Sequence, residues 1–290
     1  MLPLYDAHNH LHDAWLQPHR AQVFVDLAAT GVRCAVVNGS SEGDWGEVST
    51  LVAEAAALPQ PDRLRIIPSY GVHPWDVGNR SARWLDHLRA RLDADPRAGV
   101  GEIGLDRWML DRAKPDDPRL IGLRRAPIEE QIEVFLAQLA LATERDLPAS
   151  IHCLDAIGPL HDALRATKLP ARGFLLHSYN GSVEMVRNFA KLGAYFSFNG
   201  AFLDPRKQRL REVYAAIPAD RLLVETDAPA LRLPAELEKF PPFPVADGSL
   251  AGHPANLVAT YEGLAEIRRT PLSALATQME KNFHVFFAPA

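Results

Sequence analysis

The amino-acid sequence predicts an α/β fold, a single (β/α)8 barrel of the TIM type that occupies residues 1–290. Eight strand-like apolar runs alternate strictly with helix-like segments, a pattern typical of a parallel sheet, and the length suffices for eight such units. An open doubly wound sheet is the alternative, but its first strand normally leads into a glycine-rich phosphate loop. Here the first strand leads into histidines, which favours the barrel.

Each predicted strand is a short apolar run, as expected where a parallel sheet is buried on both faces. We expect strands over residues 4–10, 33–39, 64–72, 98–105, 148–153, 173–178, 194–199 and 221–227. Helical patterns lie between them, for example over residues 44–58, 83–93, 127–145, 183–192 and 207–216. Two further patterns, over 257–268 and 271–287, predict extra helices that close the chain.

Two connections exceed the usual length of roughly two to six residues. Residues 107–126 follow the fourth predicted strand, and residues 228–255, which are rich in proline, follow the eighth. Both should emerge at the C-terminal face of the barrel, where such folds build their sites; the alternative is that each is a variable surface loop. The basic side chains of the first connection are Arg107, Arg112, Lys114, Arg119, Arg124 and Arg125.

The composition is that of an ordinary globular protein, with 47% apolar residues and a formal net charge of −5. This charge gives no general attraction to nucleic acid, although it allows a local basic patch. We find no apolar run long enough for a transmembrane helix, no signal-peptide pattern and, with two cysteines, no disulfide framework. We therefore expect a cytoplasmic protein without a membrane or an obligate protein partner.

Histidines and carboxylates recur at the ends of the predicted strands. His8 and His10 close the first strand, where residues i and i+2 share one face about 6.6 Å apart and can reach one point. Alone, each such residue is more often packed or hydrogen-bonded, but their recurrence on one rim indicates a metal site. The later strand-like runs supply Glu102, His152, His177 and Asp227.

Imidazole and carboxylate ligands together suit Zn²⁺, Mn²⁺, Fe²⁺ or Ni²⁺, and the oxygen ligands also permit Mg²⁺. Six ligands are too many for one catalytic tetrahedral ion, which keeps three, but they suit two ions about 3.5–4 Å apart. Two such cations repel each other, so an anion must lie between them. Glu102 is the best candidate for this bridge, because Gly101 and Gly104 let the backbone approach closely.

Six short stretches, spread in order over nearly the whole chain, are 6–11 (DAHNHL), 71–74 (GVHP), 101–106 (GEIGLD), 151–153 (IHC), 177–182 (HSYNGS) and 224–229 (VETDAP). Together they resemble the TatD-type metal-dependent deoxyribonucleases of the amidohydrolase-like superfamily. The resemblance implies a distorted (β/α)8 barrel. It also implies a first metal on His8, His10, Glu102 and Asp227, and a second on Glu102, His152 and His177.

The sequence departs from the family pattern at three places, none of them a proposed ligand. His12 stands where the family commonly has aspartate, Leu154 where it commonly has arginine, and Gly252-His253-Pro254 where it has an Asn-x-Pro motif. An arginine would suit an anionic substrate. The departures therefore suggest a divergent branch with intact metal chemistry, and they leave the substrate open.

These observations predict a divalent-metal-dependent hydrolase, favouring a phosphodiesterase or deoxyribonuclease that acts on DNA or a small phosphoester through metal-activated water. Asp227 would accept the proton of that water, unless it only caps the following turn. His73 would contact the substrate or relay a proton from outside the ligand set, unless it only packs its loop. Glu225 would either orient a histidine or belong to a buried salt bridge.

Two other functions remain open on the sequence. The same metal pair could hydrolyse an amide, a cyclic amide or a lactone, and a non-catalytic scaffold could keep its metals for stability. If the substrate is nucleic acid, Arg124 and Arg125 are predicted to contact phosphates. The alternative is that these arginines pair with Glu129 and Glu130.

Overall fold

The computed structural model describes residues 1–59 and 64–288, and its centre is an eight-stranded parallel sheet. Each strand pairs with the next along the chain, so the order in space is the order in sequence. The strands are β1 (Leu4–Asn9), β2 (Val32–Asn38), β3 (Arg65–Tyr70), β4 (Gly99–Asp106), β5 (Ala149–Leu154), β6 (Phe174–Leu176), β7 (Ala194–Asn199) and β8 (Leu222–Glu225). All eight predicted strands are present, with ends displaced by a few residues.

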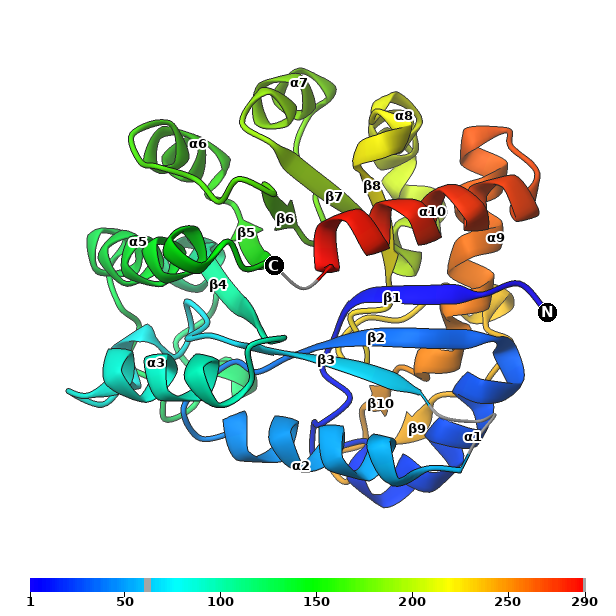
Figure 1. The fold of residues 1–290 in the computed structure, drawn as a ribbon, viewed down its shortest axis with the longest axis horizontal. Helices are drawn as coiled ribbons and strands as arrows, with labels where there is room; N and C mark the ends of the chain where they lie inside the picture. Colours follow the sequence, from blue (N-terminus) through cyan, green and yellow to red (C-terminus); the bar gives the residue numbers. More distant parts are fainter. Residues whose placement is uncertain (60–63, 289–290) are drawn as a thin grey trace.

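Most of the helices surround the strands on the outside, as Figure 1 shows, and α10 lies across one end of the barrel. They are α1 (Arg20–Thr30), α2 (Trp45–Ala57), α3 (Trp84–Ala94), α4 (Trp108–Asp111), α5 (Ile128–Arg145), α6 (Ile157–Arg165), α7 (Val183–Lys191), α8 (Gln208–Ala216), α9 (Leu257–Arg268) and α10 (Leu272–Phe287). A strand buried beneath helices must be apolar on both faces, which explains the continuous apolar runs in the sequence. The prediction of a (β/α)8 barrel is confirmed.

The barrel closes between β8 and β1 through the chain that follows β8. The backbone N–H of Asp227 donates to the carbonyl of His8 at 3.0 Å, and that of His10 donates to the carbonyl of Ala228 at 2.8 Å. These bonds lie at the C-terminal ends of the two strands. Because β8 itself does not pair with β1, the barrel is nearly closed, and these two bonds complete it. They also hold His8, His10 and Asp227 beside one another.

Helix α10 fills the opposite, N-terminal end of the barrel. Phe283 and Phe286 join a hydrophobic cluster with inward-facing strand residues that include Tyr5 and Tyr195. The ring centroids of Tyr5 and Phe283 lie 4.9 Å apart, and those of Tyr195 and Phe286 lie 4.8 Å apart. Burying one such ring contributes roughly 1.5–3 kcal/mol. This end is packed with side chains, so any substrate must approach from the C-terminal end.

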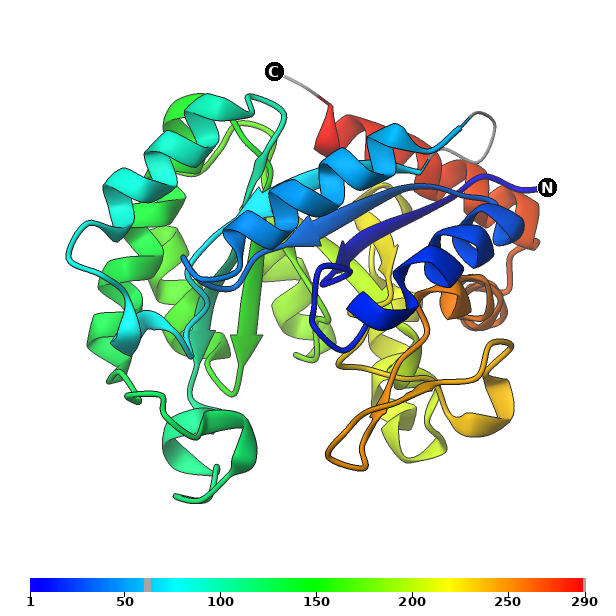
Figure 2. The same ribbon diagram turned by 90° about the horizontal axis from the view of Figure 1, so that it is seen from below.

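Both long connections lie at the C-terminal end of the barrel, at the lower edge of Figure 2. The β4 loop (residues 107–126) contains α4 and a 3₁₀ helix over Pro118–Leu120. The β8 loop (residues 228–255) contains an antiparallel hairpin of β9 (Phe243–Pro244) and β10 (Leu250–Ala251). Among the described residues, no helix combines the length and apolar character needed to cross a membrane.

Candidate metal centre

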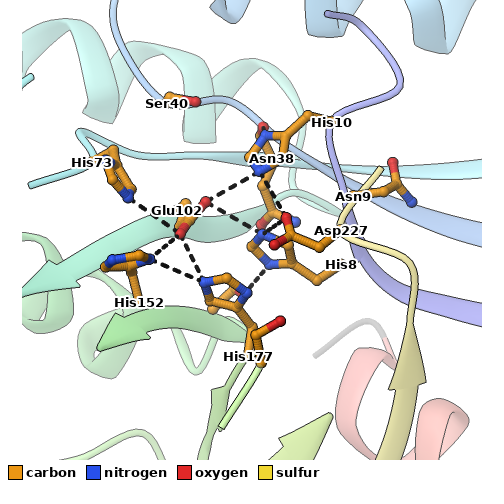
Figure 3. A network of polar contacts seen from close by, with 12 residues as sticks. His8, Asn9, His10, Asn38, Ser40, His73, Glu102, His152, His177 and Asp227 are labelled. Carbon is orange, nitrogen blue, oxygen red and sulfur yellow. Dashed lines mark hydrogen bonds and ion pairs between the residues drawn. The ribbon is translucent and has the colours of Figure 1, made fainter. Parts of the chain in front are cut away.

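The six residues singled out in the sequence come together at the C-terminal ends of the strands (Figure 3). Three of them lie within strands: His8, Glu102 and His152. The other three follow a strand directly or within two residues: His10, His177 and Asp227. Five separate strands thus supply one cluster.

Glu102 lies at the middle of this cluster, and its two oxygens face different histidines. Oε2 lies 3.3 Å from Nε2 of His8 and 3.2 Å from Nε2 of His10. Oε1 lies 2.9 Å from Nδ1 of His152 and 2.8 Å from Nε2 of His177. The carboxylate therefore divides the cluster into two sides.

Asp227 and His73 complete the two sides. Oδ1 of Asp227 lies 3.5 Å from Nε2 of His10 and 3.8 Å from Nε2 of His8, on the side of Oε2. Nε2 of His73 lies 3.4 Å from Oε1 of Glu102, on the other side. Three groups have ligand atoms within 4.8 Å of one another: His8, His10 and Asp227; His8, Glu102 and His177; and His73, Glu102 and His152.

Two glycines of β4 let the backbone around Glu102 approach its neighbours. A Cβ atom on Gly101 would lie 2.9 Å from Oδ1 of Asn38 and 2.9 Å from the side chain of Ser150. Gly104 has a φ of +144°, and a Cβ atom there would lie 2.0 Å from the carbonyl oxygen of His152. Any larger residue at these positions would separate β4 from its neighbours and move Glu102 away from the cluster.

In His8 and His10, Nε2 faces the cluster and Nδ1 has a partner that orients the ring. Nδ1 of His8 lies 2.7 Å from Oγ of Ser150, and Nδ1 of His10 lies 2.7 Å from the carbonyl oxygen of Asn38. Since a carbonyl only accepts, Nδ1 of His10 donates, and in the neutral ring Nε2 then presents a lone pair to Glu102 and Asp227. A proton or a metal cation must lie between these groups to make the contact favourable.

Two carboxylates, those of Asp106 and Glu225, lie next to His152 and His177, the histidines that face Oε1 of Glu102. Oδ2 of Asp106 lies 3.3 Å from Nε2 of His152, and it accepts the indole N–H of Trp75 at 2.6 Å. Asp106 is fully buried and also accepts the backbone N–H of Met109 through Oδ1. Nδ1 of His177 lies 3.7 Å from Oε1 of Glu225, beyond hydrogen-bond distance. Asp106 is not among the site residues predicted from the sequence, although an aspartate that ends an apolar strand is a usable signal.

Glu225 has its own donors. Its Oε1 accepts the backbone N–H of Ser178 at 2.7 Å and the hydroxyl of the same residue at 2.5 Å, and its Oε2 accepts the hydroxyl of Ser197. No part of this carboxylate is exposed. Of the two roles that the sequence left open, orientation of the chain around His177 fits these contacts, because the described structure places no arginine or lysine in contact with Glu225.

The two central carboxylates stay ionised although they are buried. Burial alone raises the pKa of Glu102, but His177, His73 and His8 nearby hold it well below its usual value. Burial also raises the pKa of Asp227, but the hydrogen bond from His10 and the nearby charges of His177 and His8 together outweigh that effect and lower it. The cluster therefore presents two anions to whatever occupies its centre.

His8 provides the clearest indication of a missing partner. Burial lowers its pKa, the charge of His177 adds to the effect, and the ring is therefore neutral. Its Nε2 is buried and makes no hydrogen bond, although it points toward Glu102 and Asp227. Buried polar atoms in native proteins nearly always have a partner, and a cation on this nitrogen would supply one.

The spacing of the donor atoms also fits a metal. Ligand atoms bound tetrahedrally at about 2.0–2.1 Å from one ion lie about 3.3 Å from each other. Nδ1 of His152 and Nε2 of His177 lie 3.3 Å apart, as do Nε2 of His8 and Oε2 of Glu102. Imidazole nitrogens and carboxylate oxygens are ligands of Zn²⁺ and Mn²⁺. The residues of the cluster thus fit a divalent metal centre.

A (β/α)8 barrel with such a centre at its C-terminal end defines the chain as a metal-dependent hydrolase of the barrel type. The family model described as TatD related DNase matches residues 5–288, and the chain belongs to this family. The resemblance stated from the sequence motifs is thereby confirmed.

Individual relatives agree with this assignment. The chain is 31% identical over 218 residues to the 3'-5' ssDNA/RNA exonuclease TatD of Erwinia amylovora, covering 75% of this chain and 76% of the relative. It is 30% identical over 232 residues to the uncharacterized metal-dependent hydrolase YabD of Bacillus subtilis, covering 79% and 81%. The crystal structure of YjjV, a TatD homolog from Escherichia coli, superposes with a TM-score of 0.79 at 26% identity, covering 98% and 97%.

The departures from the family pattern have their contacts outside the cluster. Nε2 of His12 lies 3.4 Å from Oδ2 of Asp44, and Nε2 of His253 lies 3.2 Å from Oδ2 of Asp26. The carbonyl of Leu154 accepts the backbone N–H of Arg107 at 2.9 Å. The histidines thus have acidic partners outside the cluster, and the position without the usual arginine adjoins the start of the β4 loop.

The arginines of the β4 loop already have partners within the protein. Arg124 forms two hydrogen bonds with Glu130, at 2.6 and 3.0 Å, and Arg125 donates to the carbonyls of Met109 and Ala113, both at 3.0 Å. The remaining pairs are Arg107–Asp111, Arg112–Asp155 and Arg119–Asp117. Of the two roles considered for Arg124, the structure therefore favours pairing with Glu130 over contact with phosphate.

Proposed function

We propose that this chain hydrolyses phosphodiester bonds of single-stranded nucleic acid, and that Glu102 bridges two divalent ions at its centre. The observation that carries the proposal is the division of the cluster by Glu102, whose two oxygens each face a separate pair of histidine nitrogens. Two ions with one shared carboxylate are the usual arrangement for in-line displacement at phosphorus. The name of the relative from Erwinia amylovora, an exonuclease of single-stranded DNA and RNA, supports the substrate class.

In this proposal each ion has its own ligands in addition to Glu102. His8, His10 and Asp227 would hold the ion beside Oε2, and His152 and His177 would hold the ion beside Oε1. When bound, the ions acidify a water molecule and polarise a phosphoryl oxygen. Zn²⁺, Mn²⁺ and Mg²⁺ are all compatible with these donors.

Asp227 would accept the proton that the attacking water loses. Its side chain is 11% exposed, it is ionised, and it follows β8 at the open end of the barrel. A base must be unprotonated and within hydrogen-bond distance of the water. Asp227 meets the first condition, and its place beside His8 and His10 supports the second.

His73 would contact the substrate from outside the ligand set. Its Nδ1 accepts the backbone N–H of Trp75 at 3.2 Å, so Nε2 carries the proton of the neutral ring. Burial lowers the pKa of His73, which keeps the ring neutral. An Nε2–H group cannot bind a metal, but it can donate to Glu102 or to a phosphoryl oxygen.

A comparison of substrates with and without metal tests this proposal. The full chain should cleave a single-stranded oligonucleotide and bis(p-nitrophenyl) phosphate in Mn²⁺ faster than it cleaves a lactone or an amide. Prolonged chelation should abolish hydrolysis, Mn²⁺ should restore it, and elemental analysis should find two ions per chain. Full activity in verified metal-free protein would contradict the mechanism. A single ion at saturation would contradict the bridge, and faster turnover of the lactone or amide would contradict the substrate class.

A further inference from the structure

Three planar groups form a row beside the metal centre, and none of them is a proposed ligand. The planar row consists of the indoles of Trp75 and Trp108 and the guanidinium of Arg119. The two indole centroids lie 6.1 Å apart with planes inclined by 30°, and the guanidinium carbon of Arg119 lies 4.4 Å above the centroid of Trp108. Both indoles are half-buried, and the side chain of Arg119 is 58% exposed.

One end of the planar row adjoins the catalytic cluster. The ring centroids of Trp75 and His73 lie 5.5 Å apart, and the indole N–H of Trp75 is bonded to Asp106, which contacts His152. The position of Trp75 relative to the centre is therefore fixed by a hydrogen bond. The other end of the row, Arg119, lies in the β4 loop at the rim of the barrel.

The planar row is also held in place from the side of the β4 loop. Asp117 binds the guanidinium of Arg119 through both carboxylate oxygens, at 2.9 and 2.8 Å, which fixes the guanidinium plane over Trp108. A plane that is already ordered loses little entropy when another flat group stacks on it. Arg107 and Arg112 of the same loop are also exposed, although each is paired with an aspartate.

We propose that the planar row binds an unpaired nucleobase of a single-stranded substrate whose adjacent phosphate reaches the metal centre. This proposal rests on the proposed function. Indole and guanidinium planes stack on any base, and aromatic planes combined with basic side chains are the usual means of binding single strands without sequence preference. Bases within a duplex are stacked on each other and cannot reach such a row, so the row selects unpaired ends.

The proposal locates recognition at the beginning of the β4 loop rather than at its end. Hydrogen bonds to Glu130 and to backbone carbonyls occupy three of the five N–H groups of Arg124, and bonds to backbone carbonyls occupy three of the five of Arg125. Trp108, in contrast, is half-buried and the side chain of Arg119 is 58% exposed, and stacking on either plane does not require a donor. Recognition through bases also suits a chain that has Leu154 where an anion-binding arginine is common in the family.

The test measures the affinity of the full chain in Mn²⁺ for two phosphorothioate-linked octamers, one of thymidine and one that is abasic throughout. Fluorescence anisotropy of a 5′ label gives both dissociation constants. Trp108→Ala should weaken binding of the thymidine octamer by about 5- to 150-fold, which corresponds to one lost base stack. It should change binding of the abasic octamer less than about twofold, because the backbone contacts remain. Trp108→Phe should retain most of the affinity for the thymidine octamer.

Trp15→Ala is the matched control, since Trp15 is another exposed tryptophan, 40% accessible, in the connection that follows β1. Its affinities for both octamers should stay within about twofold of the wild type. Equal losses on the two octamers in Trp108→Ala, or no loss, would overturn the planar row while leaving cleavage of oligonucleotides by the wild type intact. If the wild type instead hydrolyses only bis(p-nitrophenyl) phosphate and neither binds nor cleaves oligonucleotides, the proposed nucleic-acid substrate fails as well. Thermal unfolding and metal content of each variant verify its fold.

Discussion

In the β4 loop each arginine binds a carboxylate or a carbonyl of the protein. In the candidate metal centre, by contrast, five histidines surround Glu102, and the buried Nε2 atom of His8 has no hydrogen-bond partner. Both regions are rich in charge and both lie at the C-terminal end of the barrel (Figures 2 and 3). The difference is that the loop satisfies its charges internally and the centre does not. A run of basic residues in a sequence is therefore weak support for a ligand-binding site. A buried cluster of metal-ligating side chains with an unpaired nitrogen is strong support.

The largest expected effect follows from a change inside the centre. Asp227→Asn keeps the size and one oxygen donor but removes the group that accepts a proton. We expect kcat for bis(p-nitrophenyl) phosphate to fall by at least about 10²-fold, the lower range for general base catalysis, with at least one ion still bound. Steady-state kinetics and elemental analysis of the same sample measure both quantities. A near-normal kcat would show that another group, such as His73, takes the proton.

A smaller effect is expected one contact away from the ligands. The carboxylate of Asp106 accepts from three donors: the backbone N–H of Met109, the indole N–H of Trp75 and Nε2 of His152. Asp106→Asn replaces one of its two oxygens with an NH₂ group and therefore leaves a donor unpaired. Loss of such an orienting carboxylate should weaken metal affinity by about 10- to 100-fold. Competition with a fluorescent chelator measures this affinity.

The control for this change is Asp155→Asn, which alters the exposed pair with Arg112. Asparagine tolerates the left-handed backbone of Asp155, whose φ is 55°. Its metal affinity should remain within about twofold of the wild type. If both variants bind metal equally well, Asp106 does not orient His152, and the contrast between a sensitive centre and a tolerant loop is weaker than we infer.

The smallest effect is expected in the loop itself. Hydrogen bonds from Arg124 and Arg80 lower the pKa of Glu130 from an ordinary value of 4.5 to about 2. Because the folded protein holds this proton less tightly than the unfolded chain, the pairs stabilise the fold above pH 4.5. This contribution fades as the pH falls toward 2. Glu130→Gln should therefore lower the free energy of unfolding near neutral pH by about 1 kcal/mol or less, the range of partly exposed ion pairs.

Urea unfolding at several pH values checks the sign of this prediction. The difference between Glu130→Gln and the wild type should shrink as the pH is lowered below 4.5, and Glu129→Gln, an exposed neighbour, should show little difference at any pH. A difference that grows on acidification would contradict it. Weaker binding of oligonucleotides by Glu130→Gln would instead indicate that the Arg124 end of the loop takes part in recognition.

The sequence by itself determined the order of the strands and most of the residues in the centre. Alternation of apolar runs and helical patterns requires a parallel sheet, and the C-terminal ends of parallel strands meet on one rim. The sequence therefore predicts that six side chains lie together at this rim: His8, His10, Glu102, His152, His177 and Asp227. The six family motifs added the class of chemistry.

Only the tertiary structure decided which atoms face each other. Whether Nδ1 or Nε2 of a histidine points inward depends on the partner of the other nitrogen, such as Asn38 for His10 or Asp106 for His152, and these partners come from other strands. The tertiary structure also decides that Arg124 pairs with Glu130 and that Arg119 stacks on Trp108. Sequence periodicity reports which face of an element is buried, but hydrogen bonds and ion pairs act over about 3–4 Å between segments far apart in the chain, and folding alone sets those distances.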